Sequence, residues 1–576
     1  MAYDHNTRGM SLIEIVMGVS IMLIVFAALF AALTSIDTLG RRNELRTSAL
    51  YLANEHIETM RALPYDSIGT VSGLPHGTIP QVETITHNGH TFVRRTFIQY
   101  VDDPSDGLGA TDATIPADYK RIKVELSYAI NNATSSFSLV TTIAPKSQES
   151  LEGAGILRIN VTDANNDPLG GVTVDVENFA IATTVDITTF TNVSGTVSLP
   201  GAWAGAGYDV LVSKAGYSTA QTYPATIDNP NPSPSALTVA ENSTTEIYLK
   251  IDRLSTIDLY ARELPTRGAL EDSFADASGM LTMSDTAIAG GALVLAGTAG
   301  SYATTGTSTS ITLTPASIDE WVMFRADTAT SADHSLRFQL LHDTGGGVYQ
   351  PIPDGDLAGN EAGFSHTPID LRGLDPLTYT ALRIEAVLET SDPMTTPEVH
   401  AWSLSYREPD TPHGNMAFDM TGAETIGEDG GVPVLRYDET HTTDGAGALS
   451  LADMSFDLYT LTFTGLVVAE ACPALPLDLP PDTSYEQALT LTSASTHSLA
   501  LQVLHPLGTP IENAEVVLDD GSTVTTTLTG PCGIAYTPNL SDSTYSATVY
   551  APGLASTTVD IPVSGATAHV ETLSFW

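Results

Sequence analysis

The amino-acid sequence predicts an α+β domain, made of a long N-terminal helix and an antiparallel sheet, followed by several all-β sandwich domains. Three observations lead to this fold class. Residues 10–36 are apolar almost throughout, and helical periodicity continues beyond them to about residue 62. After Pro145 the chain is rich in Thr, Ser, Val, Gly and Pro. Turn signals recur there at intervals of roughly 8 to 12 residues, the spacing of strands in β-sandwiches.

Composition narrows the classes of function. The chain has 576 residues, enough for several domains of about 100 to 200 residues each. It carries 68 acidic and 23 basic residues, a formal net charge of -45. Such a chain repels phosphate backbones, so we expect no nucleic acid among its partners. It has no His-Glu-x-x-His helix, no Gly-x-Ser-x-Gly elbow and no phosphate-binding loop, so we predict no catalytic residues and no enzyme.

The first predicted element is a membrane-spanning helix at residues 10–36. At about 1.5 Å per residue it would be roughly 40 Å long, enough to cross a bilayer. Glu14 is its one charged residue. A carboxylate inside such a segment costs about 2.5 to 3.5 kcal/mol on insertion scales, so another group must offset it.

The same helix is expected to continue to about Ala62 as an amphipathic segment, and Pro64 ends it because the residue before a proline is pushed out of helical geometry. Polar and charged residues separate apolar positions that recur at steps of three and four. The apolar positions are Leu45, Ala49, Leu52, Ala53, Ile57 and Met60, and the polar ones between them are Arg46, Asn54, Glu55 and Glu58.

An antiparallel sheet is predicted over residues 64–150. Asn88-Gly89 suits the type I′ turn of a hairpin between strand-like segments at 82–86 and 91–98. Two further strands are expected at 119–130 and 135–143.

The N-terminus carries the most specific motif of the chain. A short leader, residues 1–9, ends in Gly9, and Glu14 is the fifth residue after it. This arrangement resembles the type IV prepilin signature, which the pseudopilins of type II secretion share, and residues 64–150 are more loosely similar to minor pilins. The resemblance implies that a prepilin peptidase cuts after Gly9 and methylates the amine of Met10. It also implies that Glu14 pairs with such an amine when helices pack in a filament.

Two features depart from this pattern. The family most often begins with Phe where this chain has Met10. Arg41, Arg42 and Arg46 lie on the side that the resemblance places outside the membrane, against the positive-inside tendency. An uncleaved signal anchor therefore stays open as an alternative. An ordinary secretory signal fits less well, because its apolar core should span only about 7 to 15 residues.

A repeated motif organises the rest of the chain. A Thr-x3-Gly segment is followed each time by a Tyr within a strand-like run, as in Thr191, Gly195 and Tyr208; Thr443, Gly447 and Tyr459; and Thr529, Gly533 and Tyr545. The first copy, residues 151–252, resembles carboxypeptidase-regulatory-like domains on Ile156–Thr162, Asp163–Val174 and Lys214–Tyr217. Such domains are transthyretin-like sandwiches, and no catalytic residue follows from the resemblance.

Further domain boundaries are expected on either side of a different module. Residues 253–408 predict a jelly-roll-like sandwich, of a kind common in sugar-binding and adhesive proteins, which by itself transfers no function. Residues 409–485 predict a further sandwich repeat, and residues 486–576 resemble the carboxypeptidase-regulatory-like copy less closely.

Three groups of residues are candidate sites. Clustered carboxylates on one loop suit Ca²⁺, the one candidate cofactor, although a solvated acidic turn has the same composition; they are Asp102, Asp103, Asp106, Asp112 and Asp118. Trp321, Tyr349 and Trp402 are candidates for carbohydrate stacking, with burial in a sandwich core as the alternative. Cys472 and Cys532 are the only cysteines, and in an exported protein we expect a disulfide between them, with two buried thiols as the alternative.

Together these expectations describe a minor type IV pilin or pilus-associated surface protein that displays β-sandwiches for adhesion. It would start in the inner membrane on a single helix and then join other pilins in a filament at the cell surface. Its further candidate partners are surface glycans and a host or neighbouring cell. A type II secretion pseudopilin and a membrane-anchored, glycan-active enzyme are the alternatives.

Overall fold

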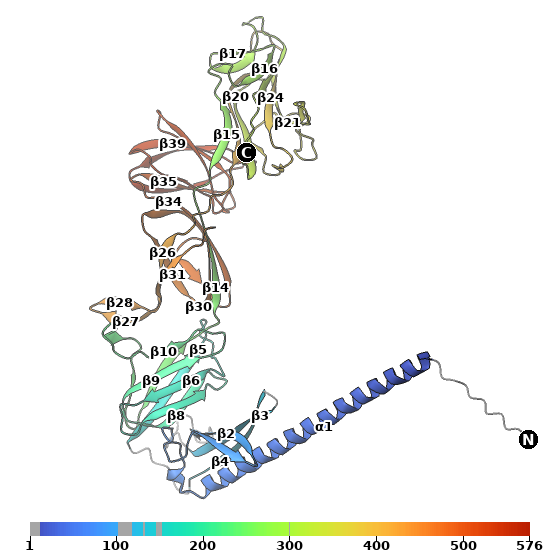
Figure 1. The fold of residues 1–576 in the computed structure, drawn as a ribbon. Coiled ribbons are helices and arrows are strands. Elements are labelled where there is room, and N and C mark those ends of the chain that lie inside the picture. The colour runs from blue at the N-terminus through green and yellow to red at the C-terminus, as the bar shows by residue number, and fades with distance from the viewer. Residues whose placement is uncertain (1–11, 102–117, 131–132, 146–152, 299, 576) are drawn as a thin grey trace, which may run out of the picture. The chain divides into compact units, whose positions relative to one another are not determined.

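The computed structural model describes residues 12–101, 118–130, 133–145, 153–298 and 300–575. They form one N-terminal helix followed by β-sheets, mostly antiparallel, in an all-β, multi-domain C-terminal part (Figure 1). The chain divides into two compact units, residues 1–253 with 425–434 and residues 254–424 with 435–576. Each unit is described by itself.

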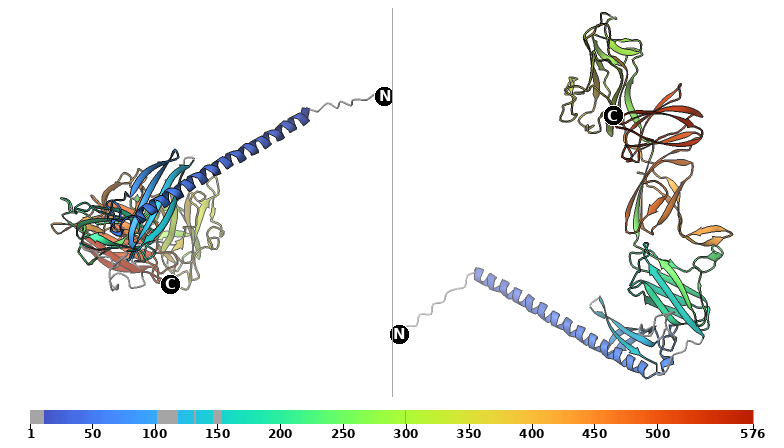
Figure 2. Two further views of the ribbon diagram at one scale, coloured as in Figure 1. Left: turned by 90° about the horizontal axis from the view of Figure 1, so that it is seen from below. Right: turned by 180° about the vertical axis from the view of Figure 1, so that it is seen from behind.

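Unit 1 begins with helix α1 (Leu12–Arg61), a short 3-10 turn η1 (Tyr65–Ser67) and a four-stranded antiparallel meander. Its strands follow chain order: β1 (Val82–His87), β2 (His90–Val101), β3 (Tyr119–Ile130) and β4 (Ala133–Ile143). The β1–β2 turn has positive φ at both Asn88 and Gly89, 51° and 77°, as a type I′ turn requires. The sheet packs against the second half of α1, and the views in Figure 2 show the first half extending away from it.

The rest of unit 1 is a β-sandwich. One sheet has the order β13-β5-β8 and the other β10-β9-β6-β7, with β12 added beside β9. The hairpin β27–β28 pairs with β11. The bounds are β5 (Ala154–Thr162), β6 (Thr173–Asn178), β7 (Val185–Phe190), β8 (Thr196–Trp203), β9 (Gly205–Ser213), β10 (Ala220–Gln221), β11 (Asn231–Pro232), β12 (Leu237–Val239), β13 (Thr244–Lys250), β27 (Thr425–Asp429) and β28 (Val432–Leu435).

Unit 2 contains a second sandwich whose strands are not contiguous in sequence. Its sheets have the orders β30-β14-β34-β32 and β29-β26-β31-β33. The bounds are β14 (Ser255–Arg262), β26 (Ala417–Gly422), β29 (Asp438–Thr442), β30 (Ala448–Met454), β31 (Asp457–Phe463), β32 (Leu466–Cys472), β33 (Leu477–Leu479) and β34 (Ser484–Ser493).

Between β14 and β26 the chain forms the middle module, which has two larger sheets. One has the order β17-β18-β25-β20-β23, with β15 beside β25, and the other β16-β19-β24-β21-β22. The bounds are β15 (Arg267–Asp272), β16 (Met280–Ser284), β17 (Thr286–Ala289), β18 (Ala292–Leu295), β19 (Thr305–Ser310), β20 (Glu320–Ala329), β21 (His334–Asp343), β22 (Tyr349–Pro351), β23 (Ile369–Asp370), β24 (Leu382–Thr390) and β25 (Glu398–Arg407).

A third sandwich completes unit 2, with sheets β38-β35-β41 and β37-β36-β39-β40. The bounds are β35 (Ser498–Leu504), β36 (Glu515–Asp519), β37 (Val524–Leu528), β38 (Ile534–Thr537), β39 (Ser543–Tyr550), β40 (Thr557–Val563) and β41 (Ala566–Thr572).

The three sandwiches share one topology. In each sandwich, the first strand pairs with two neighbours. It is parallel to the last strand and antiparallel to the fourth. These triplets are β13-β5-β8, β34-β14-β30 and β41-β35-β38. The internal repeat seen in the sequence is therefore a repeat of whole sandwiches.

The second sandwich differs from the boundaries expected from the sequence. The sequence predicts one module over residues 253–408 and the next over 409–485, but β14 pairs with β30 and β34 and so belongs to the second sandwich. Its last strand, β34, also crosses the expected boundary at residue 485. The middle module is thus an insertion between the first two strands of a sandwich. The pairing that places β14 in the second sandwich joins residues far apart in the sequence, so no local pattern indicates it.

The Thr-x3-Gly motif has the same geometry in all three sandwiches. The threonine Oγ1 accepts a hydrogen bond from a backbone N–H at the start of the second strand and donates one to a carbonyl three residues earlier. The N–H and carbonyl partners are Val172 and Leu169 for Thr191, Met416 and His413 for Thr443, and Ala514 and Ile511 for Thr529.

The motif glycine ties this turn to the first strand. Gly195, Gly447 and Gly533 have φ of 70°, 73° and 74°, a region that favours glycine. Their carbonyls accept hydrogen bonds from first-strand N–H groups, those of Val161, Ala261 and Val503. A Cβ on each glycine would press against the carbonyl oxygen of the same first-strand residue.

We expect Thr529→Val to destabilise the third sandwich by about 1 to 3 kcal/mol, because the buried N–H of Ala514 loses its partner. Thr525→Val, at an exposed position on the neighbouring strand β37, should be nearly neutral and is the matched control. Denaturant unfolding followed by hydrogen exchange in β36 measures both. Equal effects of the two substitutions would contradict this role for Thr529.

Candidate assembly helix and neighbouring sites

The first half of α1 offers an apolar surface that nothing else in the described structure covers. Each large apolar side chain described between Ile13 and Leu39 is at least half exposed, from 50% at Val25 to 71% at Phe30. By length and composition the helix could cross a membrane, although a signal sequence near an N-terminus passes the same test. Since a helix that is hydrophobic all round is stable only when buried in protein or lipid, this half requires an apolar environment.

The second half of α1 is held by the meander. The apolar positions predicted from periodicity, Leu45, Ala49, Leu52, Ala53, Ile57 and Met60, are all at most 5% exposed. They share a core with inward-facing residues of β2 and β3 such as Phe92, Ile122, Val124 and Leu126. The charged face points to solvent, where Arg61 binds Glu58 and Thr141. One helix therefore joins an uncovered apolar half to a half anchored in a folded domain.

One ionisable side chain lies in this helix–sheet core. His56 is 8% exposed, and its Nε2 is 3.0 Å from Oγ1 of Thr96 on β2. Burial, together with the nearby Arg94 guanidinium, lowers the pKa of His56 from 6.5 to about 4, although the Glu83 carboxylate opposes the shift. The imidazole is therefore neutral in the folded protein at neutral pH.

Alanine substitutions of two leucines, one in each half of α1, test whether only the second half packs on the meander. Leu52→Ala should destabilise the α1–meander domain by about 2 to 5 kcal/mol, because it leaves a cavity in a packed core. Leu29→Ala, at a position 55% exposed, should leave that domain's stability unchanged. Hydrogen exchange of β3 amides in detergent-solubilised protein measures both. A large effect of Leu29→Ala would show that the first half of α1 packs on the domain.

His56 predicts a pH dependence of stability. Its folded pKa of about 4 lies below the unfolded value of 6.5, so the unfolded chain binds the proton first and stability is lost as pH falls from 6.5 towards 4. At 1.36 kcal/mol per unit, the full loss is about 3 kcal/mol. His56→Gln should remove this part of the pH dependence. Calorimetry of both proteins between pH 7 and about 4 checks it, and parallel pH profiles would contradict it.

The predicted processing residues lie at the start of the chain. Gly9 and Met10 are outside the described residues, and Glu14 lies within the helical span of α1. Their processing therefore stays a prediction from the sequence.

The predicted calcium loop is mostly outside the described structure. Asp102, Asp103, Asp106 and Asp112 fall there. The backbone N–H of Asp118 donates to the carbonyl of Val101 and so closes the strands that flank the loop. Among the described residues, no group of three or more His, Cys, Asp or Glu side chains could hold a metal ion.

The carbohydrate platform predicted in the middle module is wrong for its two tryptophans. Trp321 and Trp402 are 0% and 1% exposed, and both belong to the core between the two sheets. Trp321 Nε1 donates to the carbonyl of Tyr379. Tyr349 is half-buried on β22, and the Arg383 guanidinium lies over its ring at 3.4 Å from the centroid. Large aromatic rings are the side chains that fill a wide two-sheet core, which accounts for the burial.

The two cysteines form a disulfide in the structure, with Cα atoms 5.7 Å apart. Cys472 ends β32 of the second sandwich, and Cys532 lies in the Thr-x3-Gly turn of the third. The bridge therefore joins two sandwiches rather than two strands of one.

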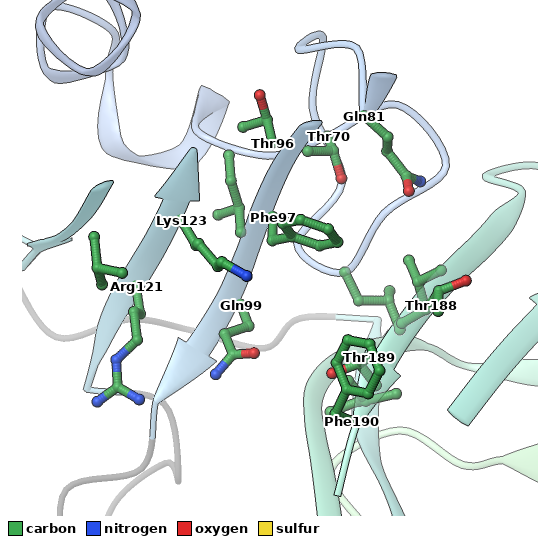
Figure 3. Close-up of a pocket in the computed structure, with 15 residues that line it drawn as sticks. Thr70, Gln81, Thr96, Phe97, Gln99, Arg121, Lys123, Thr188, Thr189 and Phe190 are labelled. Atoms are coloured by element: carbon green, nitrogen blue, oxygen red, sulfur yellow. The ribbon is translucent and has the colours of Figure 1, made fainter. Parts of the chain in front are cut away.

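A cavity of about 220 Å³ lies in unit 1 beside the outer face of the meander (Figure 3). Across that face, Phe97 on β2 is paired with Lys123 on β3, which is paired with Val140 on β4. Ile187 and Phe190 from the edge strand β7 form the opposite wall. Lys123, which forms an ion pair with Glu125 at 2.9 Å, and a neighbouring arginine of β3 also line the cavity.

Sequence reasoning missed this cavity, although a signal for it was present. Phe97 and Val140 alternate with residues that face α1, so they point to the outer face of the sheet. Val140 is 55% exposed there. Apolar residues on the face expected to be polar are a sign of a second covering surface.

No protein-family model and no curated protein matches this chain. Solved structures that it is similar to include the Bacillus anthracis TIE protein, at 10% identity over 87% of this chain and 76% of that one, with a TM-score of 0.15. BcpA, the major pilin subunit of Bacillus cereus, is 10% identical over 73% of this chain and 99% of that one, with a TM-score of 0.13. The shaft pilin SpaA from Lactobacillus rhamnosus GG is 10% identical over 29% and 90%, also with a TM-score of 0.13. At these TM-scores the likeness carries no argument about function.

Proposed function

We propose that this chain is a minor type IV pilin, a pilus-associated surface protein that assembles through α1 and displays β-sandwiches for adhesion. The observation that carries the proposal is the division of α1 into an exposed apolar half and a half anchored on the meander. The apolar half needs a bilayer before assembly and neighbouring helices after it. Because the second half of α1 packs on the meander, the folded domain enters a filament together with the helix.

The N-terminal residues supply the chemistry of assembly in this proposal. Cleavage after Gly9 by a prepilin peptidase frees an amine at Met10. In a filament, that cation and the Glu14 carboxylate of a neighbouring helix offset each other's burial. Leaving either charge alone in an apolar core is strongly unfavourable, so the pair also fixes the register between subunits.

The β-sandwiches act by binding or spacing in this proposal, and not by catalysis. They follow the meander as a large all-β part, too bulky for dense packing along a filament, so a tip or sparse position suits the chain. Surface glycans and host or neighbouring cells are the partners that we propose. Tight glycan binding without turnover on polysaccharide panels would support display, and turnover would support a glycan-active enzyme.

Mass spectrometry of the N-terminus of protein from sheared surface filaments tests the assembly. We expect N-methylated Met10 in that fraction. Intact Met1, with the protein confined to membranes, would mean a signal anchor. Processed protein that stays in the envelope beside a secretion machine would favour a type II secretion pseudopilin.

Two glutamate-to-glutamine substitutions test the proposed role of Glu14 in filament assembly. Glu14→Gln should leave cleavage after Gly9 intact but lower the amount in sheared filaments at least about tenfold, because the buried amine loses its counter-charge. Glu44→Gln removes an exposed carboxylate from the same helix and should change nothing. Equal filament yields from both variants would contradict the role of Glu14. Immunoblots of the sheared and membrane fractions give the result.

A further inference from the structure

The Thr-x3-Gly turns contain one more hydrogen-bond acceptor, and its origin differs between the sandwiches. In the first, Oδ1 of Asn192, the residue after the motif threonine, accepts from the N–H groups of Ser194 and Thr196 at 2.9 and 3.0 Å. In the second, Oδ1 of Asp444 accepts from the N–H groups of the residues two and four positions later, both at 2.8 Å. A side-chain oxygen thus accepts hydrogen bonds from two backbone N–H groups that have no backbone acceptor within the tight turn.

The third sandwich lacks this side chain, because Gly530 occupies the position of Asn192 and Asp444. The backbone of the turn is nevertheless the same. Gly530 N–H donates to the carbonyl of Ile534 at 3.1 Å, as Asn192 N–H does to that of Thr196 at 3.0 Å. The corresponding donors, the N–H groups of residues 532 and 534, still need an acceptor.

Glu470 of the second sandwich supplies it. Its Oε1 accepts from Cys532 N–H at 2.8 Å and from Ile534 N–H at 3.2 Å. The side chain is 5% exposed. Burial raises the pKa of Glu470, and the hydrogen bonds from Ile534 and Cys532 oppose that rise. Because Glu470 is far from Gly530 in sequence and lies on another sandwich, this contact is entirely tertiary.

Two local features make the contact possible. The pairing of β32 with β34 shifts register between Val468 and Glu470, and this irregularity leaves Ala469 and Glu470 both buried, although consecutive residues of a strand normally face opposite sides. The carboxylate then enters the space that a side chain at residue 530 would fill, since a Cβ there would overlap Glu470 Oε2. Glycine at 530 and glutamate at 470 are therefore complementary.

We propose that Glu470 is a clasp: the second sandwich completes the turn of the third, so that the fold of the third depends on its neighbour. The Cys472–Cys532 disulfide joins the same two segments, and it holds the carboxylate-bearing strand beside the turn. Glu470 is a positioning residue for the junction between the sandwiches, and its role is separate from the proposed assembly through α1.

A rescue experiment in the full-length, oxidised protein tests the clasp. Glu470→Ala should speed amide exchange at Cys532 and Ile534 at least about tenfold, because two backbone donors lose their acceptor. Gly530→Asn alone should do the same, by clashing with Glu470. The double variant Glu470→Ala with Gly530→Asn should return exchange to within about threefold of the parent, because the introduced asparagine would accept both bonds as Asn192 does. An asparagine also suits a position that precedes a proline.

Hydrogen exchange with mass spectrometry over residues 529–537 measures the parent and these three variants. Glu486→Ala removes an exposed carboxylate from β34 in the same sandwich and should leave exchange unchanged. Glu470→Gln keeps an oxygen acceptor, so it should lie between parent and Glu470→Ala and gives a reading if the alanine variant does not fold. Unchanged exchange in Glu470→Ala or Glu470→Gln, a harmless Gly530→Asn, or a double variant no better than Glu470→Ala would each overturn the clasp.

Discussion

The structure depends above all on one constraint: the two halves of a 50-residue helix require different surroundings. Its second half buries six apolar side chains against a four-stranded meander. Its first half presents apolar side chains on all sides and gains stability only where water is absent. In the proposed function, this one helix links the folded part of the protein to lipid or to neighbouring helices.

A second principle organises the sandwiches, namely that their tight turns must satisfy every buried backbone donor. The motif threonines do this within each sandwich, and the motif glycines let the turn approach the first strand. The remaining donors are satisfied locally in two sandwiches and by Glu470 in the third. The third sandwich also forms ion pairs with the middle module. Its fully buried Glu515 binds Arg267 and Arg325 of that module.

The middle module is inserted without disrupting the second sandwich. A domain placed between the first two strands of a sandwich must leave the two sheets that these strands join intact, and β14 remains paired with both β30 and β34. Buried polar pairs such as Glu515 with its two arginines are specific in geometry, since each charge is costly without its partner. They thus fix how the inserted module meets the third sandwich within unit 2.

Local patterns in the sequence determined much of the fold. The period of 3.6 placed the six buried positions of α1, Asn88-Gly89 placed the hairpin, and the Thr-x3-Gly motif marked equivalent turns in three sandwiches. Each of these depends on residues close in sequence, where backbone geometry and side-chain spacing act directly.

Tertiary structure alone decided the rest, because the deciding contacts join distant residues. Whether Trp321 and Trp402 face a ligand or a core depends on which sheets stack, and the structure buries both. The sheet that β14 joins depends on strands that come much later in the chain, beyond the whole middle module. The acceptor for the turn at Gly530 comes from another sandwich, and a glycine gives no local sign of which side chain will fill the space beside it.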